Sequence, residues 1–159
     1  MGIPDNTHIK IGAALPGDLP QLLGLYQYMI PDDPLLPIDD ALQQHWQSIL
    51  ANDALFYIVA RVGDRVVSTC ALTIIPNLTR SARPYGLIEN VVTHPDYRKR
   101  GIGTQVLQHA LEIAWNHDCY KVMLLTGSKN EATLRFYENA GFLRGEKTGF
   151  VIRNVRATP

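Results

Sequence analysis

The spacing of apolar residues changes twice in the first third of the chain. Apolar and polar residues alternate over 8–15, which predicts a strand. Over 16–29 and 39–50 the apolar residues recur at helical spacing, which predicts two helices with Asp18 and Asp39 placed to cap them. Prolines between the two helices predict a loop.

The middle of the chain is rich in β-branched and aromatic residues. Two such runs, 55–61 and 65–75, flank Gly63–Asp64, which predicts a hairpin. A polar segment over 76–86 predicts a loop, and "LIENVV" over 87–92 predicts a further strand.

The last part of the chain alternates between helical and strand spacing. An apolar stripe at helical spacing follows Gly103, and "KVMLLTG" then predicts a strand. A helix is expected over 130–141, capped by Asn130 and ended by Gly141. Two short strands around Gly149, in "FLRGEKTGFVIRNV", are predicted to close the chain.

This order of elements predicts the fold class. A strand, a helix and a strand joined by a crossover of this length need at least one parallel pairing, whereas the hairpins are antiparallel. We therefore predict an α/β fold with a mixed sheet and helices on both faces. The 159 residues, without repeats or low-complexity segments, suit a single domain over 1–159.

The composition excludes some classes of function but does not identify one. The chain has 15 basic and 15 acidic side chains, and this balance argues against a general nucleic-acid binder. No apolar run approaches the roughly 20 residues that span a bilayer, and the start has no apolar signal core, so we expect a cytoplasmic protein without a membrane partner. Cys70 and Cys119 stand beside apolar residues and are expected to be buried free thiols.

The stretch "YRKRGIG" concentrates positive charge and glycine at the start of a helix. The first amides of a helix have no intrahelical acceptor, and the helix dipole is positive at that end. Glycines let a ligand approach the main chain, and basic side chains add charge. The stretch therefore predicts a pyrophosphate cradle. Its residues are Arg98, Lys99, Arg100, Gly101 and Gly103.

Two common phosphate-binding motifs do not fit this stretch. A nucleotide P-loop has a lysine after its last glycine, and there is none here. A dinucleotide-binding fingerprint has three glycines directly after a strand, whereas here Val106 takes the third position and "HPDYRKR" separates the strand from the glycines.

The stretch instead resembles the R/Q-x-x-G-x-G/A motif of the GNAT family of N-acetyltransferases, carried by Arg98, Gly101 and Gly103. "IENVVTHPDYRKRGIG" is similar to the family's fourth strand and pyrophosphate loop, and "KVMLLTGSKNEATLRFYENAGF" to its fifth strand and following helix. The resemblance covers about residues 55–145. It implies the acyl-CoA N-acyltransferase fold, whose mostly antiparallel sheet has one parallel pair of strands that splay apart around acetyl-CoA.

The resemblance implies a set of positions that bind acetyl-CoA. Val91 and Val92 would pair through their main chain with the pantetheine arm, although both also suit a core. Asn130 would contact the same arm, or serve only as a helix cap. The pyrophosphate loop would consist of Arg98, Lys99, Arg100, Gly101, Ile102, Gly103 and Thr104.

The resemblance also implies direct transfer of the acetyl group to an amine. Tyr137 would protonate the departing thiolate, since a phenol with a pKa of about 10 keeps its proton at neutral pH. Glu89, in an otherwise apolar strand, would act as base directly or through a water, and burial would raise its pKa. A backbone N–H of the same strand would stabilise the oxyanion. His94 is a rival base, but its position before Pro95 in a turn favours a structural role.

Neither a metal site nor a covalent intermediate is predicted. His109 and His117 lack a close set of further ligands. Cys119 precedes the predicted fifth strand and lies away from the inferred site, so it does not suit a nucleophile.

The resemblance implies that the first two helices with their loop, and the loop before the fourth strand, cover the acceptor; here the two loops carry opposite charges. Asp32 and Asp33 would hold a cationic amine, and Arg80 and Arg83 a carboxylate or phosphate, unless all four are solvated. The favoured acceptor is a primary amine of a small molecule, and the second choice is a protein N-terminus or lysine. A non-catalytic acyl-CoA-binding sensor stays open. The tail "FVIRNV", with little after it to cover an edge, suggests a homodimer.

Overall fold

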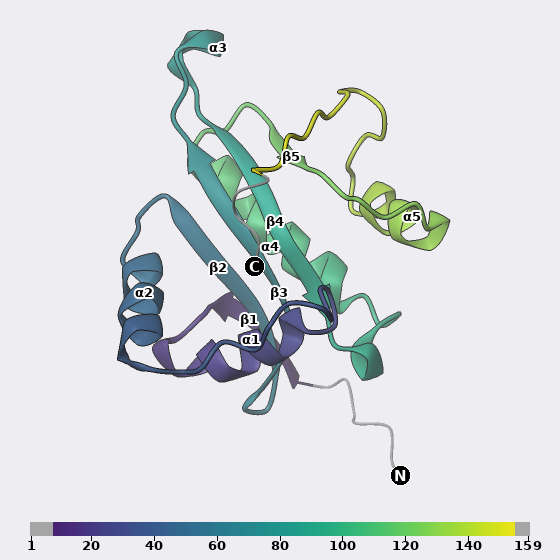
Figure 1. Cartoon of the computed structure of the whole chain (residues 1–159). Helices are drawn as coiled ribbons and strands as arrows, with labels where there is room; N and C mark the ends of the chain where they lie inside the picture. Colours follow the sequence, from purple (N-terminus) through teal and green to yellow (C-terminus); the bar gives the residue numbers. More distant parts are fainter. Residues whose placement is uncertain (1–7, 155–159) are drawn as a thin grey trace.

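The computed structural model describes residues 8–154, and a five-stranded sheet forms its centre (Figure 1). The strands lie in chain order; the first four are antiparallel neighbours, and the last pair is parallel. The predicted mixed, mostly antiparallel sheet is therefore confirmed. Its strands are β1 (Ile9–Ala13), β2 (Leu55–Val62), β3 (Arg65–Ile75), β4 (Tyr85–Thr93) and β5 (Val122–Leu124).

Helices cover both faces of the sheet, as predicted (Figure 1). The long α4 (Ile102–Asn116) packs against β2, β3 and β4 on one face, while α1 (Leu19–Tyr26) and α2 (Asp40–Leu50) pack on the other. The last helix, α5 (Glu131–Asn139), follows β5 and contacts α4. The short α3 (Thr79–Ala82) lies within the predicted loop, and Pro16–Asp18 and Pro95–Tyr97 form 3₁₀ turns.

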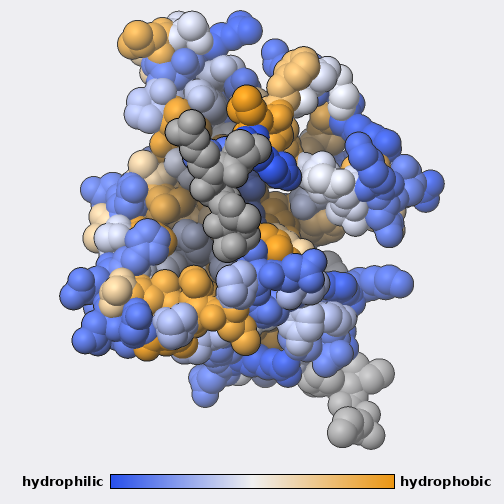
Figure 2. All heavy atoms as spheres, in the orientation of Figure 1, coloured by the Kyte–Doolittle hydropathy of each residue, from blue (hydrophilic) through white to orange (hydrophobic). Residues whose placement is uncertain are grey.

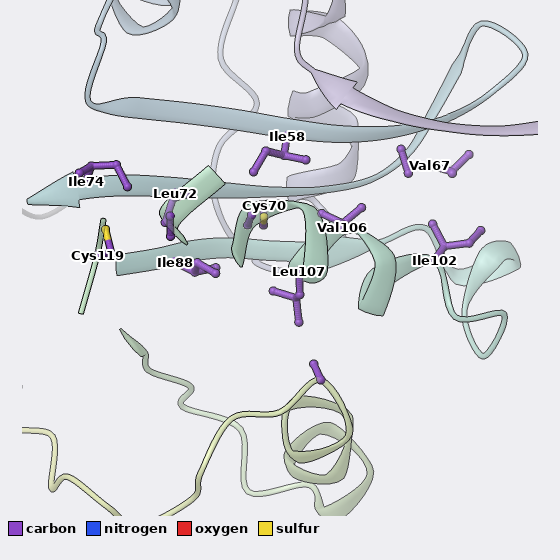
Figure 3. Close-up of a cluster of buried hydrophobic side chains, with 14 of the residues drawn as sticks. Ile58, Val67, Cys70, Leu72, Ile74, Ile88, Ile102, Val106, Leu107 and Cys119 are labelled. Carbon is purple, nitrogen blue, oxygen red and sulfur yellow. The ribbon is translucent and has the colours of Figure 1, made fainter. Parts of the chain in front are cut away.

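The sheet separates two hydrophobic clusters. On the α4 face, side chains of the strands such as Ile58, Leu72 and Ile88 lie beside Val106 and Leu107 of the helix (Figure 3). Each fully buried side chain of this size contributes about 1.5–3 kcal/mol to stability. The second cluster joins α1 and α2 to the opposite face and is formed by Ala14, Leu19, Leu22, Leu25, Trp46, Val59, Val66 and Val92. Both cysteines are buried and free, as expected.

Two of the three predicted helix caps are confirmed. Asp39 accepts a hydrogen bond from the Leu42 amide at 2.9 Å, and Asn130 accepts one from the Ala132 amide at 2.8 Å. Asp18 precedes α1 but does not cap it. Its buried carboxylate instead accepts from the Leu15 amide and pairs with Arg61, because a buried charge needs a partner of opposite sign.

The two strands predicted around Gly149 are absent from the part of the segment that the structure describes, and only Val155 of that segment lies outside it. Residues 143–154, called the tail below, are exposed, and Phe150 and Ile152 keep 91% and 98% of their surface in solvent. A strand-forming sequence becomes a strand only where an edge pairs with it, and here the tail pairs with none.

Candidate active site

The strand β5 pairs with only part of its parallel neighbour β4. The register runs from Gly86 opposite Val122 to Ile88 opposite Leu124, where β5 ends. Beyond Ile88 the strand β4 continues to Thr93 without β5 beside it, and the chain after β5 leads into α5. The main chain of 89–93 therefore borders a gap between two diverging segments.

A β-bulge lies in this part of β4. Val92 is opposite Thr69 and Glu89 is opposite Ala71, so two residues of β4 face one residue of β3. Asn90 has a φ of 55°, a left-handed conformation that asparagine adopts more readily than most residues. The bulge leaves Val92 in the α1 cluster while Val91 packs against the α4 cluster. An asparagine within a run of β-formers was the signal for this bulge, and our sequence reading missed it.

The helix α4 begins without a side-chain cap. Gly101 occupies the N-cap position with a φ of 75°, and no side chain caps the helix. The first intrahelical bond runs from the Gln105 amide to the Gly101 carbonyl at 3.0 Å, so the amides of the preceding helical residues have no acceptor within the helix. An uncapped helix N-terminus of this kind suits an anion.

The two glycines of the motif serve different purposes. Gly101 is exposed and needs its positive φ, which side chains disfavour. Gly103 is buried, and a Cβ there would lie 3.1 Å from both Phe136 Cζ and Thr93 Oγ1. Gly103 thus lets the start of α4 pack closely against α5 and the end of β4, a packing role that our sequence reading did not foresee.

The basic side chains also brace the loop itself. Arg98 Nε donates to the Thr93 carbonyl at 2.9 Å, and the Arg100 guanidinium lies 5.3 Å from the centre of the Tyr97 ring. Lys99 is exposed and has a φ of 59°. Two further residues of the predicted loop lie in the first turn of α4. Ile102 is buried in the core, and Thr104 is half-buried.

His94 joins three parts of the chain beside this loop. Its Nε2 lies 2.9 Å from Arg65 Nη2 and 3.2 Å from the Tyr28 hydroxyl, and its ring meets Tyr97 edge-on. Burial, and then the charge of Arg65, lower the pKa of His94. These contacts match the structural role that its place in a turn indicated.

Tyr137 and Glu89 come from two different elements, α5 and β4. Tyr137 is half-buried on α5, and its pKa is raised by burial first and then by Cys70 and Glu89. The phenol therefore keeps its proton throughout the neutral range. Glu89 is exposed on β4, so the burial that we expected to favour its role as a base is absent.

Two tyrosines that our sequence reading did not single out lie on the α1 side of the bulge. Tyr57 is in register with Ala71, and Ala71 with Glu89, so Tyr57 and Glu89 share a face of the sheet. Burial raises the pKa of Tyr57 and of Tyr26, and Asn90 interacts with the Tyr57 hydroxyl. The Tyr26 hydroxyl is buried and has no hydrogen-bond partner among the described residues. Helical spacing assigned Tyr26 only to an apolar stripe, and nothing local marked Tyr57.

The four charged residues considered for the acceptor are all exposed. Asp32 and Asp33 are exposed in the loop between α1 and α2. Arg83 pairs with Asp118 at 3.0 Å, and Arg80 lies 5.9 Å from the centre of the Tyr120 ring. Both arginines precede the start of β4, about 13 Å or more along the strand from Glu89, so this arrangement does not favour them as acceptor ligands.

The loop between α1 and α2 also exposes apolar side chains. Together with neighbouring residues they form the hydrophobic band along the lower front of the molecule (Figure 2). The exposed aliphatic residues of this loop are Ile30, Leu35, Leu36 and Ile38.

Within residues 8–154, no three histidine, cysteine, aspartate or glutamate side chains gather closely enough to hold a metal ion. Over the same residues, no helix has the length and apolar character needed to cross a bilayer.

Comparison with known proteins identifies the class to which this fold and site belong. The family described as "Acetyltransferase (GNAT) family" matches residues 22–142, which is most of the chain. The protein therefore belongs to the GNAT acetyltransferase family.

One solved structure matches most of the chain, and two curated relatives are named for different acceptors. A putative acetyltransferase from Agrobacterium tumefaciens str. C58 superposes with a TM-score of 0.86 at 49% identity, covering 91% of this chain and 99% of that one. A glucosamine 6-phosphate N-acetyltransferase of Trypanosoma brucei brucei is 40% identical over 83 residues, or 52% of this chain and 54% of the relative. An N-alpha-acetyltransferase 30 of Xenopus laevis is 32% identical over 91 residues, or 56% of this chain and 32% of the relative. The chain thus spans about half or less of these two curated relatives.

Proposed function

We propose that this protein is an acetyl-CoA-dependent N-acetyltransferase that acetylates a primary amine of a small molecule, with 1–159 as a single catalytic domain. The observation that carries the proposal is the uncapped start of α4 beside the unmatched stretch of β4. The first feature suits a diphosphate, and the second offers main-chain groups to an extended arm. Family membership supports the reaction class.

The binding roles follow from this juxtaposition. The amides of Gly101 to Thr104 bind the pyrophosphate, with Arg98, Lys99 and Arg100 adding positive charge. The main chain at Val91 and Val92 pairs with the pantetheine arm, which is compatible with their side chains packing on opposite faces. Asn130 caps α5 and lies in the segment after β5 that borders the other side of the gap.

The chemistry needs a base for the ammonium group and an acid for the sulfur. Glu89 accepts a proton from the amine, directly or through a water, which its exposed position allows. The free amine attacks the thioester carbonyl, and a backbone N–H near the bulge stabilises the developing oxyanion. Tyr137 donates its proton to the leaving sulfur as the carbon–sulfur bond breaks, and the second proton that the nitrogen loses restores the phenol through solvent. The raised pKa of Tyr137 supports this role because it keeps the phenol protonated.

The α1 side of the bulge supports a small, polar acceptor. Tyr57 and Asn90 place neutral hydrogen-bonding groups there, and neutral phenols and amides suit hydroxyl groups. The Trypanosoma brucei relative is named for an amino-sugar phosphate, which supports the same class of acceptor. We propose no specific sugar.

A peptide amine is the second candidate, and one observation favours it. The Xenopus laevis relative is named as an N-alpha-acetyltransferase, and the exposed apolar loop between α1 and α2 offers a surface for a peptide side chain.

We also propose that the protein works in the cytoplasm as a homodimer. Buried free thiols are typical of a reducing compartment. The exposed apolar tail supports a contact between two copies.

The test separates binding from turnover. Calorimetry with acetyl-CoA is followed by measurement of thiol release with amino sugars, their phosphates, other small amines and short peptides. Turnover on small amines is the expected result. Turnover on peptides alone would establish the second candidate, binding without any turnover would identify a sensor, and absence of binding heat would overturn the proposal.

A further inference from the structure

His94 lies at the junction between β4 and the loop that leads into α4, and its ring is buried. It precedes the 3₁₀ turn 95–97, and only 9% of its surface is exposed. Its amide donates to the Val67 carbonyl at 2.8 Å, and its carbonyl accepts from the Tyr97 amide at 2.9 Å. The position of His94 therefore sets where the loop of residues 98–104 leaves the sheet.

Each ring nitrogen of His94 faces a group that can only donate. The Asp96 amide donates to Nδ1 at 3.2 Å, and Arg65 Nη2 lies 2.9 Å from Nε2. The Tyr28 hydroxyl, 3.2 Å from Nε2, can donate or accept. A neutral imidazole has one accepting nitrogen, and an imidazolium has none. The neutral ring therefore keeps one of the two donor contacts, whereas the charged ring loses both.

The charges around the ring also disfavour its protonated form. Burial first, and then the cationic side chains of Arg65 and Arg98, lower the pKa of His94. The carboxylate of Asp96 acts in the opposite direction. Its Oδ2 is 3.9 Å from Nδ1 and its side chain is 75% exposed, so solvent screens the attraction. A positive charge on this ring thus meets more repulsion than attraction.

Contacts of the same residues connect His94 to the basic part of the loop. The rings of Tyr28 and Tyr97 meet the imidazole edge-on, and neither supplies a countercharge. Tyr97 is buried, and the guanidinium groups of Arg65 and Arg100 lie 5.6 and 5.3 Å from the centre of its ring. A displacement of the imidazole or of Arg65 therefore disturbs Tyr97, and with it the loop.

We propose that His94 is a positioning residue for acetyl-CoA, which holds the loop of residues 98–104 in its binding arrangement only while the imidazole is neutral. The inference rests on the proposed function, because it concerns the amides proposed to bind the diphosphate. Protonation removes both donor contacts of the ring and releases the loop. By linkage, protonation of His94 and binding of acetyl-CoA oppose one another. Acetyl-CoA should therefore bind more weakly in acid.

Calorimetry measures the dissociation constant of acetyl-CoA between pH 7.5 and 5 for the full-length wild type and for His94→Gln. Glutamine keeps an accepting and a donating group but takes up no proton, so the two proteins should bind alike at pH 7.5. At pH 5 the wild type should have lost at least about threefold more affinity, which corresponds to roughly half a pKa unit between free and loaded protein.

Two controls assign this difference to His94. The ligand's own phosphate monoester titrates at about pH 6 in both samples, so its effect cancels between the two profiles. His45→Gln replaces an exposed histidine on α2, and its profile should follow the wild type. Circular dichroism at each pH verifies that every protein is folded.

Asp96→Asn gives an independent test at an exposed position. The backbone amide of residue 96 still donates to Nδ1, but the carboxylate that favours the imidazolium is gone. The loss of affinity should therefore move to lower pH than in the wild type. This variant decides the question if His94→Gln does not fold.

Two results would overturn the positioning role alone. A wild-type profile parallel to that of His94→Gln would show that the charge of the ring does not act on the loop. An Asp96→Asn profile that is not displaced to lower pH would assign the wild-type decline to other groups. Absence of acetyl-CoA binding at pH 7.5 would overturn the proposed function and this inference with it, so the two kinds of failure are distinguishable.

Discussion

Two consecutive regions of this protein carry equally clear sequence signals for strands and helices, but the predicted elements form completely in only one of them. From β4 through α4, a strand, a turn with glycines and a helix all form where the sequence predicts them. From β5 through the tail, the strand is short, the helix forms as predicted, and the two final strands are absent from the described residues. The first region packs against the rest of the sheet within one chain. The second ends at a sheet edge, where strand propensity has no partner to act on.

Tyr137 lies where the two regions meet, and its replacement should have the largest effect. Tyr137→Phe removes the proposed acid while keeping the ring, so turnover should fall about 100-fold with acetyl-CoA affinity nearly unchanged. Because its pKa is raised above 10, ionisation of Tyr137 should lower wild-type turnover only above pH 10. Steady-state kinetics and calorimetry measure both quantities.

Tyr120→Phe is the matched control for this change, since Tyr120 lies near the opposite end of β5. Equal loss of turnover in both variants would assign the effect to packing and not to proton transfer.

Gly103 tests how tightly the first region is packed. Gly103→Val places side-chain atoms where Phe136 and Thr93 already lie, so it should destabilise the fold by roughly 1–3 kcal/mol and weaken acetyl-CoA binding as the loop shifts. Urea unfolding and calorimetry measure these effects. Gly24→Ala is the control, because a Cβ there meets nothing within 4 Å. A Gly103→Val protein as stable as the wild type would contradict the packing role.

A comparison of the two confirmed caps tests whether Asn130, in the second region, binds acetyl-CoA as well as capping α5. Asp39→Ala and Asn130→Ala each remove one cap bond of similar length and should each cost about 1 kcal/mol of stability. Only Asn130→Ala should also weaken acetyl-CoA binding. Equal affinity in the two variants would leave Asn130 as a cap alone.

His94 should produce the smallest effect, and only in acid. Its pKa in the folded protein lies below the ordinary 6.5, so the unfolded chain binds more protons as the pH falls below 6.5. The stability linked to His94 is therefore complete above pH 6.5 and declines as the pH falls through the lower folded value. His94→Gln should flatten this dependence in urea titrations between pH 7.5 and 5. An unchanged slope would show that other groups dominate.

The sequence by itself determined the five strands, the helices α1, α2, α4 and α5, the mixed sheet, the family and the loop that suits a pyrophosphate. It did so because turns, caps and apolar spacing act over a few residues, and "YRKRGIG" contains the motif in one piece. Only the tertiary structure decided what depends on distant partners. It showed that Gly103 is required by Phe136, that Asp18 pairs with Arg61, and that Tyr26 and Tyr57 meet at the bulge. The tail belongs to this second group, because a strand forms only where another edge of the sheet supplies its hydrogen bonds.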